Sequence, residues 1–222
     1  QDSLAALFTS QMDDGGVAMP VRVMLLMTLL SLIPALFIAM TSFIRIIVVL
    51  SMLRFAFGMQ QTPPNMVLLS LAFLLTVFNT QPALDSAYTN AFLPYTEGEL
   101  STQDALEKGS QPFRTFMIAQ TREKDLILMT ELAEQSSPTQ PEEIETMTLI
   151  PAFMLSELKT AFQIGFVIFL PFLLIDIVVA SVLMSMGMLM VPPMMISLPI
   201  KVLMFVLIDG WHLVIESLML SF

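Results

Sequence analysis

The chain has 222 residues, of which 56% are apolar and 13% charged, and its 19 acidic and 9 basic residues give a formal net charge of −10. A soluble domain is about 25% charged, and a chain this short has too little interior to bury so much apolar surface, so lipid or partner subunits must cover the rest. The scarcity of basic residues excludes a nucleic-acid-binding protein, and the absence of cysteine excludes thiolate chemistry and disulfides.

The first residues predict a short segment followed by a membrane helix. Residues 1–20 begin at Gln1 and lack the basic start and apolar core of a secretory signal, so we expect either that a signal was removed or that the chain was trimmed. Residues 21–80 then predict a first hydrophobic helical hairpin. Its uncharged run Val23–Ile44 is long enough to cross a hydrocarbon core about 30 Å thick, and Pro34 inside it predicts a kink.

A second apolar run, Met66–Phe78, follows two prolines. Pro63 and Pro64 suit the first turn of a helix, because the N–H group that proline lacks is not needed there. The run is short for a full crossing, so we expect a helix buried in an assembly or the returning half of a hairpin. Arg45 and Arg54 lie between the two runs, and the positive-inside bias places that turn on the cytoplasmic side.

Residues 81–148 carry most of the acidic side chains and predict a water-facing helical insert. Ser101 and Asp104 resemble a capping box that opens a short helix, and Gly109 is expected to end it. A longer helix is expected from Pro112, and residues 135–141 are expected to form a loop. The predicted packed face of this region comprises Phe113, Phe116, Met117, Leu128, Met129 and Leu132.

Residues 149–222 predict a second hydrophobic hairpin. The uncharged runs Ala161–Ile175 and Ile177–Ile200 contain several prolines, and we expect two helices joined at the double proline, Pro192 and Pro193. The expected fold is therefore all-α, a membrane protein of kinked helical hairpins with a hydrophilic helical insert.

The sequence contains few residues that could form the active site of an enzyme. The one histidine, His212, shares a helical face with Asp209 and Glu216, which favours a polar stripe at a partner or membrane surface over a proton relay. No cluster of His, Cys, Asp or Glu has the spacing of metal ligands, and no glycine-rich loop has the spacing that holds phosphate, so we expect no metal and no cofactor.

Two isolated charges flank the double proline. An unpaired charge at membrane depth costs about 2.5–3.5 kcal/mol, so Asp176 and Lys201 should have partners. Antiparallel helices would bring them together, within one chain or between neighbouring copies. Such a pair fixes the register of the helices, and the alternative is a moving or proton-carrying pair.

The segment from residue 184 to 193, MSMGMLMVPP, alternates methionines at Met186, Met188 and Met190. A period of two suits an extended segment, and Gly187 and Pro192 both disfavour a helix here. Flexible thioethers repeated around a ring of subunits would form a compliant apolar collar that excludes water and ions yet deforms around a passing chain. The alternative is ordinary core methionine.

Several runs closely resemble the FliP family of flagellar type III export-gate proteins. They are PAFMLSELKTAFQIGF at 151–166, FLPFLLID at 169–176, MGM at 186–188, VPP at 191–193, SLPIK at 197–201, DGW at 209–211, TSFIRI at 41–46 and QTPPN at 61–65. Related injectisome proteins share much of this pattern, but the VPP after the methionines and the long hydrophilic insert are more similar to the flagellar branch.

The resemblance implies an inner-membrane protein at the flagellar basal body, made with a cleavable signal and partly raised towards the periplasm. It implies a pentameric ring that assembles with FliQ, FliR, FlhB and FlhA, surrounded by lipid, and exports unfolded flagellar proteins. It also implies a pore gasket at Met186, Met188 and Met190, and polar contacts between neighbours at Glu157, Asp176 and Lys201. The alternative function is a small secondary transporter using Asp176, Lys201, Asp209 and His212, although no paired halves are visible.

Overall fold

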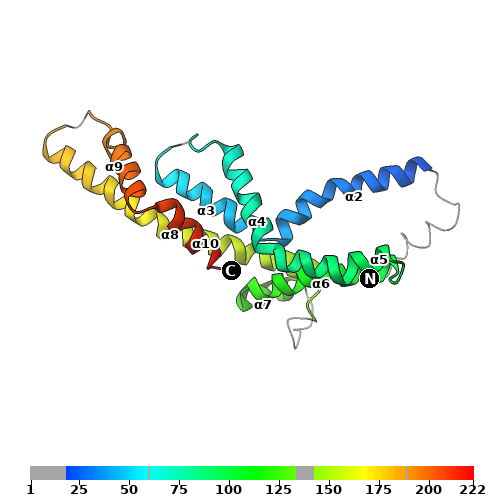
Figure 1. Cartoon of the computed structure of the whole chain (residues 1–222). Helices are drawn as coiled ribbons and strands as arrows, with labels where there is room; N and C mark the ends of the chain where they lie inside the picture. Colours follow the sequence, from blue (N-terminus) through cyan, green and yellow to red (C-terminus); the bar gives the residue numbers. More distant parts are fainter. Residues whose placement is uncertain (1–18, 60, 134–142, 189) are drawn as a thin grey trace. The chain divides into compact units, whose positions relative to one another are not determined.

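The computed structural model describes residues 19–59, 61–133, 143–188 and 190–222, which form helices and connecting turns without any strand. The prediction of an all-α fold is confirmed (Figure 1). The described residues form two compact units, one from those between 19 and 41 and between 80 and 153, and the other from those between 42 and 79 and between 154 and 222. Helices α4 (Asn65–Ala87) and α8 (Thr146–Ser185) each contribute to both units.

The first unit contains the helices of the acidic region together with the apolar helix α2. It comprises α2 (Met19–Met40), the end of α4, the π-helical turn η1 (Tyr88–Phe92), α5 (Leu93–Thr96), α6 (Thr102–Gln120), α7 (Glu123–Leu132) and the start of α8. Its core is a cluster of buried side chains, Met117, Leu126, Ile144, Leu149, Ala152 and Phe153, against which Phe116 and Met129 pack. The Arg114 guanidinium donates to Thr146 Oγ1 at 2.9 Å and to the Ile144 carbonyl, which ties α6 to the start of α8.

The predicted start of α6 is confirmed and its predicted end is wrong. Ser101 is the N-cap, and its hydroxyl accepts from the Asp104 backbone N–H at 3.2 Å while donating to the Asp104 carboxylate at 2.7 Å. The helix then continues through Gly109 and Pro112 to Gln120. A Cβ atom at Gly109 would lie 3.4 Å from the Ala91 Cβ, so this glycine serves the close approach of α6 to η1 rather than a helix stop.

The predicted packed face of the insert is only partly present. Met117 is fully buried, and Phe116 and Met129 pack on the core, but Leu128 and Leu132 are exposed on α7. The sequence placed one long helix where the chain has two, with a break at Thr121 and Arg122 that rotates α7 away from the expected periodicity. The loop predicted at 135–141 lies outside the described residues.

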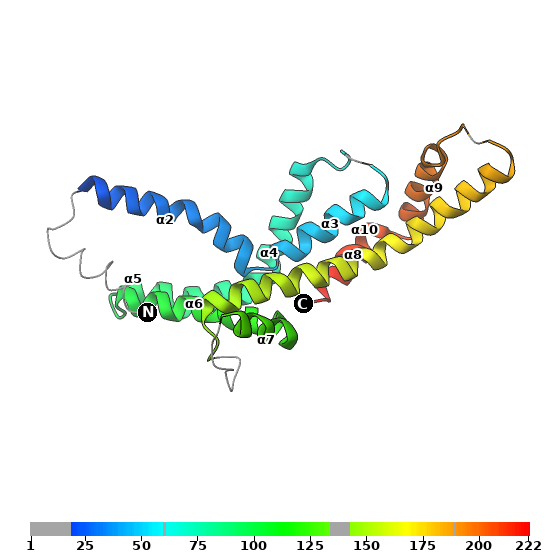
Figure 2. The same ribbon diagram turned by 180° about the vertical axis from the view of Figure 1, so that it is seen from behind.

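The second unit contains α3 (Phe43–Ala56), most of α4, most of α8, α9 (Pro193–Leu207) and α10 (Gly210–Met219). In Figures 1 and 2 α9 runs back along the last part of α8, as expected for helices joined at the double proline. Helix α9 meets α10 with a bend of 66°. The bend is at Asp209, which adopts a left-handed conformation with φ 52°, and at Gly210.

An aromatic cluster packs the interior of this unit. Phe57, which follows α3, lies with its ring centroid 4.9 Å from those of both Phe172 on α8 and Phe205 on α9. Trp211 on α10 meets the edge of Phe205 at 5.6 Å. All three phenylalanines are buried, so these contacts connect α3, α8 and α9.

The predicted membrane segments need two corrections. The run Val23–Ile44 is not one helix, because α2 ends at Met40 and α3 begins at Phe43, with buried Thr41 and Ser42 between them. The run Met66–Phe78 is not short, because it belongs to a continuous helical stretch, Asn65–Thr96, of 32 residues. Arg45 lies inside α3 and is buried, while Arg54 lies in the last turn of that helix; the cytoplasmic side of the turn stays a prediction.

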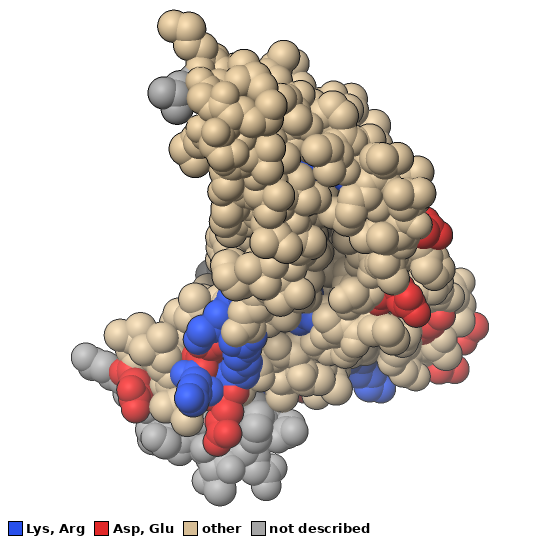
Figure 3. All heavy atoms as spheres, turned by 90° about the vertical axis from the view of Figure 1, so that its left-hand side faces the viewer, with Lys and Arg blue, Asp and Glu red and all other residues tan. Residues whose placement is uncertain are grey.

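By length and composition, two described helical stretches are suited to crossing a membrane, Asn65–Thr96 and Thr146–Ser185, and the number rises to as many as four if each of two bent helix pairs forms one span. Helix α8 is 40 residues long and continues through Pro171 without a break. Large apolar side chains along these helices stay exposed in the single chain, and Figure 3 shows a face largely free of charge, with the charged side chains gathered in its lower part. Lipid or other chains must cover such surfaces.

Candidate functional site

The methionine loop, residues 186–192, joins α8 to α9 and is built by local backbone signals. Gly187 adopts φ 77°, a conformation that favours glycine, and its N–H donates to the Met184 carbonyl at 3.0 Å. The Met188 N–H donates to the Leu183 carbonyl at 3.0 Å, which completes a Schellman ending of α8. At the other side Pro192, with ψ 121°, starts α9. The chain therefore has a loop here, although it opens with a turn rather than the extended segment that the alternation predicts.

All three predicted gasket residues lie in this loop with their side chains uncovered. Met186 is 63% exposed, Met188 38% and Met190 98%, while Leu189 lies outside the described residues. These methionines are therefore not core residues of the single chain. Uncovered apolar side chains on a turn fixed by backbone hydrogen bonds are free to contact another molecule without loss of the hairpin beneath them.

An ion pair anchors the hairpin behind this loop. Lys201 on α9 donates from Nζ to Asp176 Oδ2 on α8 at 2.6 Å and to the Ala56 carbonyl at the end of α3 at 3.0 Å. The Lys201 side chain is 3% exposed and the Asp176 side chain 32%. The predicted pairing of Asp176 with Lys201 is thus present within one chain, where it holds three helices together.

A hollow of about 430 Å³ lies between the ion pair and the loop, lined by Asp176, Ile177, Ala180, Pro192, Pro193 and Met194. Its walls are apolar apart from the Asp176 carboxylate. The Oδ1 atom of Asp176 is buried and has no hydrogen-bond partner among the described residues.

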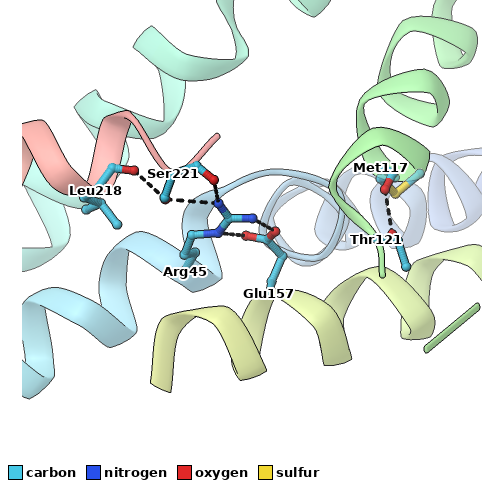
Figure 4. A network of polar contacts seen from close by, with 6 residues as sticks. All are labelled: Arg45, Met117, Thr121, Glu157, Leu218 and Ser221. Atoms are coloured by element: carbon cyan, nitrogen blue, oxygen red, sulfur yellow. Dashed lines mark hydrogen bonds and ion pairs between the residues drawn. The ribbon is translucent and has the colours of Figure 1, made fainter. Parts of the chain in front are cut away.

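A second buried ion pair joins α3 to α8. Arg45 Nε donates to Glu157 Oε2 at 2.9 Å, and its Nη2 atom donates to the other carboxylate oxygen. Arg45 Nη1 donates to the Ser221 carbonyl at 2.6 Å and to Ser221 Oγ at 3.1 Å, while its Cζ atom lies 4.0 Å from the centre of the Phe222 ring. Figure 4 shows the guanidinium between the carboxylate and the end of the chain. Both side chains are at most 2% exposed.

The sequence analysis did not predict this second pair. Glu157 is predicted to contact a neighbouring copy, and in the single chain it is paired with Arg45. The available signal was one lone arginine and one lone glutamate in apolar runs, each of which requires a partner. Contacts of Glu157, Asp176 and Lys201 between copies stay a prediction.

The polar residues of α10 do not join either pair. His212 and Glu216 approach to 3.8 Å with side chains 70% and 55% exposed, and Asp209 precedes the helix. This arrangement fits the polar stripe rather than a buried relay. Among the described residues, no group of three or more His, Asp or Glu side chains is arranged to hold a metal ion.

Comparison with known proteins places the chain among flagellar relatives. A model described as the FliP family matches residues 26–218. The chain is 50% identical over 221 residues to the flagellar biosynthetic protein FliP of Pectobacterium carotovorum subsp. carotovorum, which covers 99% of this chain and 86% of that one. It is 48% identical over 213 residues to the protein of the same name from Bacillus subtilis (strain 168), with 96% of each chain covered. A third relative of that name, from Caulobacter vibrioides, is 50% identical over 197 residues.

Proposed function

The chain belongs to the FliP family, and on that premise we propose that it is a membrane-embedded component of the flagellar protein-export apparatus whose copies surround a pore. It is a structural component and not an enzyme. The family match favours this function over the small secondary transporter. In the proposed assembly the copies form a pentameric ring with FliQ, FliR, FlhB and FlhA at the inner membrane, partly raised towards the periplasm, and unfolded flagellar proteins pass through it.

The methionine loop supports a gasket in that pore. The loop presents Met186, Met188 and Met190 to the surroundings, and its base is fixed by hydrogen bonds between backbone groups. Thioether side chains have three rotatable bonds and adapt to irregular partners. A ring of such loops closes by excluding water when nothing passes and yields when a polypeptide enters.

The exposed apolar helices support an assembly rather than a lone chain. Phe162 and Phe166 on α8 are 58% and 59% exposed, and Val206 and Leu207 on α9 are 69% and 76% exposed. Surfaces of this kind are contact surfaces for other chains or for lipid.

Substitution in the loop tests the proposal. Replacing Met186, Met188 and Met190 together by alanine removes the long side chains that would fill the closed pore. Ion leak across the inner membrane should therefore rise while flagellin export is retained. Leucine at the same positions keeps most of the apolar volume and should give a smaller rise than alanine. Unchanged leak in the alanine variant, with the complex still assembled, would reject the gasket role.

A further inference from the structure

We infer that the methionine loop is a site of reversible oxidation by hydrogen peroxide, and that sulfoxides at Met186 and Met190 open the closed pore to ions. The first half of this inference stands on the exposure of the loop. The second half rests on the proposed function, because it requires that the loop closes a pore.

The chemistry needs only the thioether and the oxidant. A sulfur lone pair attacks one oxygen of hydrogen peroxide, the O–O bond breaks, sulfur is oxidised to the sulfoxide, and the other oxygen leaves as water after proton transfer. The chain has 20 methionines and no cysteine, so no thiol of its own competes for the oxidant. Reductases that act on methionine sulfoxide return the thioether, which makes the change reversible.

The loop differs from the exposed methionines of α2 in its surroundings. Met27 on α2 is 64% exposed in the single chain, close to the 63% of Met186, but it belongs to a run of apolar residues in a helix. Lipid or packed helices are expected to cover Met27. Met186 and Met190 belong instead to the connection between α8 and α9, where their side chains are 63% and 98% exposed, so we expect dissolved peroxide to reach their sulfur atoms. Met117, by contrast, is fully buried in the core of the first unit.

Oxidation would change the lining of the pore without unfolding the hairpin. The bonds that end α8 run from the Gly187 and Met188 N–H groups to backbone carbonyls, and no sulfur atom takes part in them. A sulfoxide is polar and accepts hydrogen bonds, whereas a thioether is a weak acceptor. An apolar constriction that closes by dewetting holds water again when such groups line it.

The first test maps sulfoxides. Membranes that contain the assembled complex are treated with hydrogen peroxide, quenched, and analysed by peptide mass spectrometry over time. Met186 and Met190 should be oxidised to the sulfoxide about tenfold faster than Met27, because dissolved peroxide must reach the sulfur atom. Met117 should react slowest. Equal rates at Met186 and Met27, or no sulfoxide in the loop, would overturn the inference.

The second test measures ion leak before and after peroxide in the same cells. Peroxide should raise the leak of the unaltered protein, and added methionine sulfoxide reductase should reverse the rise. A variant with leucine at 186, 188 and 190 has no loop sulfur, so its leak should not change on treatment, whatever its starting level. The matched control, Met24→Leu with Met27→Leu, should keep the rise.

The outcomes separate the two ideas. If alanine in the loop raises the leak and loop sulfoxides form, but peroxide leaves the leak unchanged, the oxidation inference fails and the gasket stands. If neither alanine nor oxidation of the loop changes the leak, the gasket fails and the inference fails with it.

Discussion

The buried pair of Arg45 and Glu157 is expected to hold α3 against α8, and Arg45→Met tests it. The substitution removes both bonds to the Glu157 carboxylate and both bonds to Ser221 while keeping an apolar side chain of similar length. Glu157 is fully buried and would remain without its cation. Removing one partner of a buried ion pair costs about 3–5 kcal/mol, because the other group stays desolvated.

A loss of that size is readily measured. For a chain of this length, it corresponds to a fall of roughly 6–20 °C in the unfolding midpoint. The assay is thermal unfolding of the purified protein in mild detergent, followed by near-UV circular dichroism. The double variant Arg45→Met with Glu157→Met should regain much of the loss, since apolar groups of similar volume often replace a buried ion pair without penalty.

Two further variants sharpen the comparison. Ser221→Ala removes the hydroxyl, which accepts from Arg45 at 3.1 Å and donates to the Leu218 carbonyl at 2.6 Å, but it keeps the Ser221 carbonyl, so it should cost about 1 kcal/mol. His212→Ala removes an exposed side chain and should leave the midpoint unchanged. If Arg45→Met unfolds at the temperature of the unaltered protein, or if the double variant is no more stable than the single, the assigned role of this pair is wrong.

Two more predictions concern the ion pair between α8 and α9 and the close contact between α9 and α10. Lys201→Met and Asp176→Asn should show coupling in a double-mutant cycle scored by assembly of the export complex, because their charged atoms lie 2.6 Å apart; strict additivity would contradict the pairing. Gly210→Ala should lower the unfolding midpoint in detergent by an amount equivalent to about 1–3 kcal/mol, because its Cβ would overlap the buried Phe205 ring. Gly98→Ala, at φ 79° with nothing within 4 Å, should cost only the backbone strain of about 1 kcal/mol, so equal losses would argue against the overlap at Phe205.

Features set by local chemistry could be predicted from the sequence. The Ser101 cap, the end of α8 at Gly187 and the restart of α9 after Pro192 depend on residues within one helical turn of each other. The Asp176–Lys201 pair was also predictable, because a double proline folds two apolar helices back on each other and the charges of opposite sign nearest to it on either side are Asp176 and Lys201.

Features set by tertiary contacts could not be predicted. Gly109 reads as a helix stop, yet α6 continues because the missing side chain lets it approach Ala91. The break between Met40 and Phe43 falls within an uncharged run and has no glycine or proline. The partner of Arg45 lies 112 positions away in the sequence, and neither residue indicates which charge of opposite sign it will meet.

Stability and gating are expected to depend on different residues, so experiments can distinguish them. The polar groups that hold the helices of the second unit together are Arg45 with Glu157, between α3 and α8, and Asp176 with Lys201, between α8 and α9; all four are wholly or partly buried. The methionines of the loop, Met186, Met188 and Met190, form none of these bonds and do not line the hollow beside Asp176. Substitutions in the ion pairs should therefore change how much folded complex exists, whereas substitutions or sulfoxides in the loop should change what passes through the complex that remains. A loop variant that lowers the unfolding midpoint as much as Arg45→Met would show that the loop belongs to the fold, and the case for a separable gasket would end there.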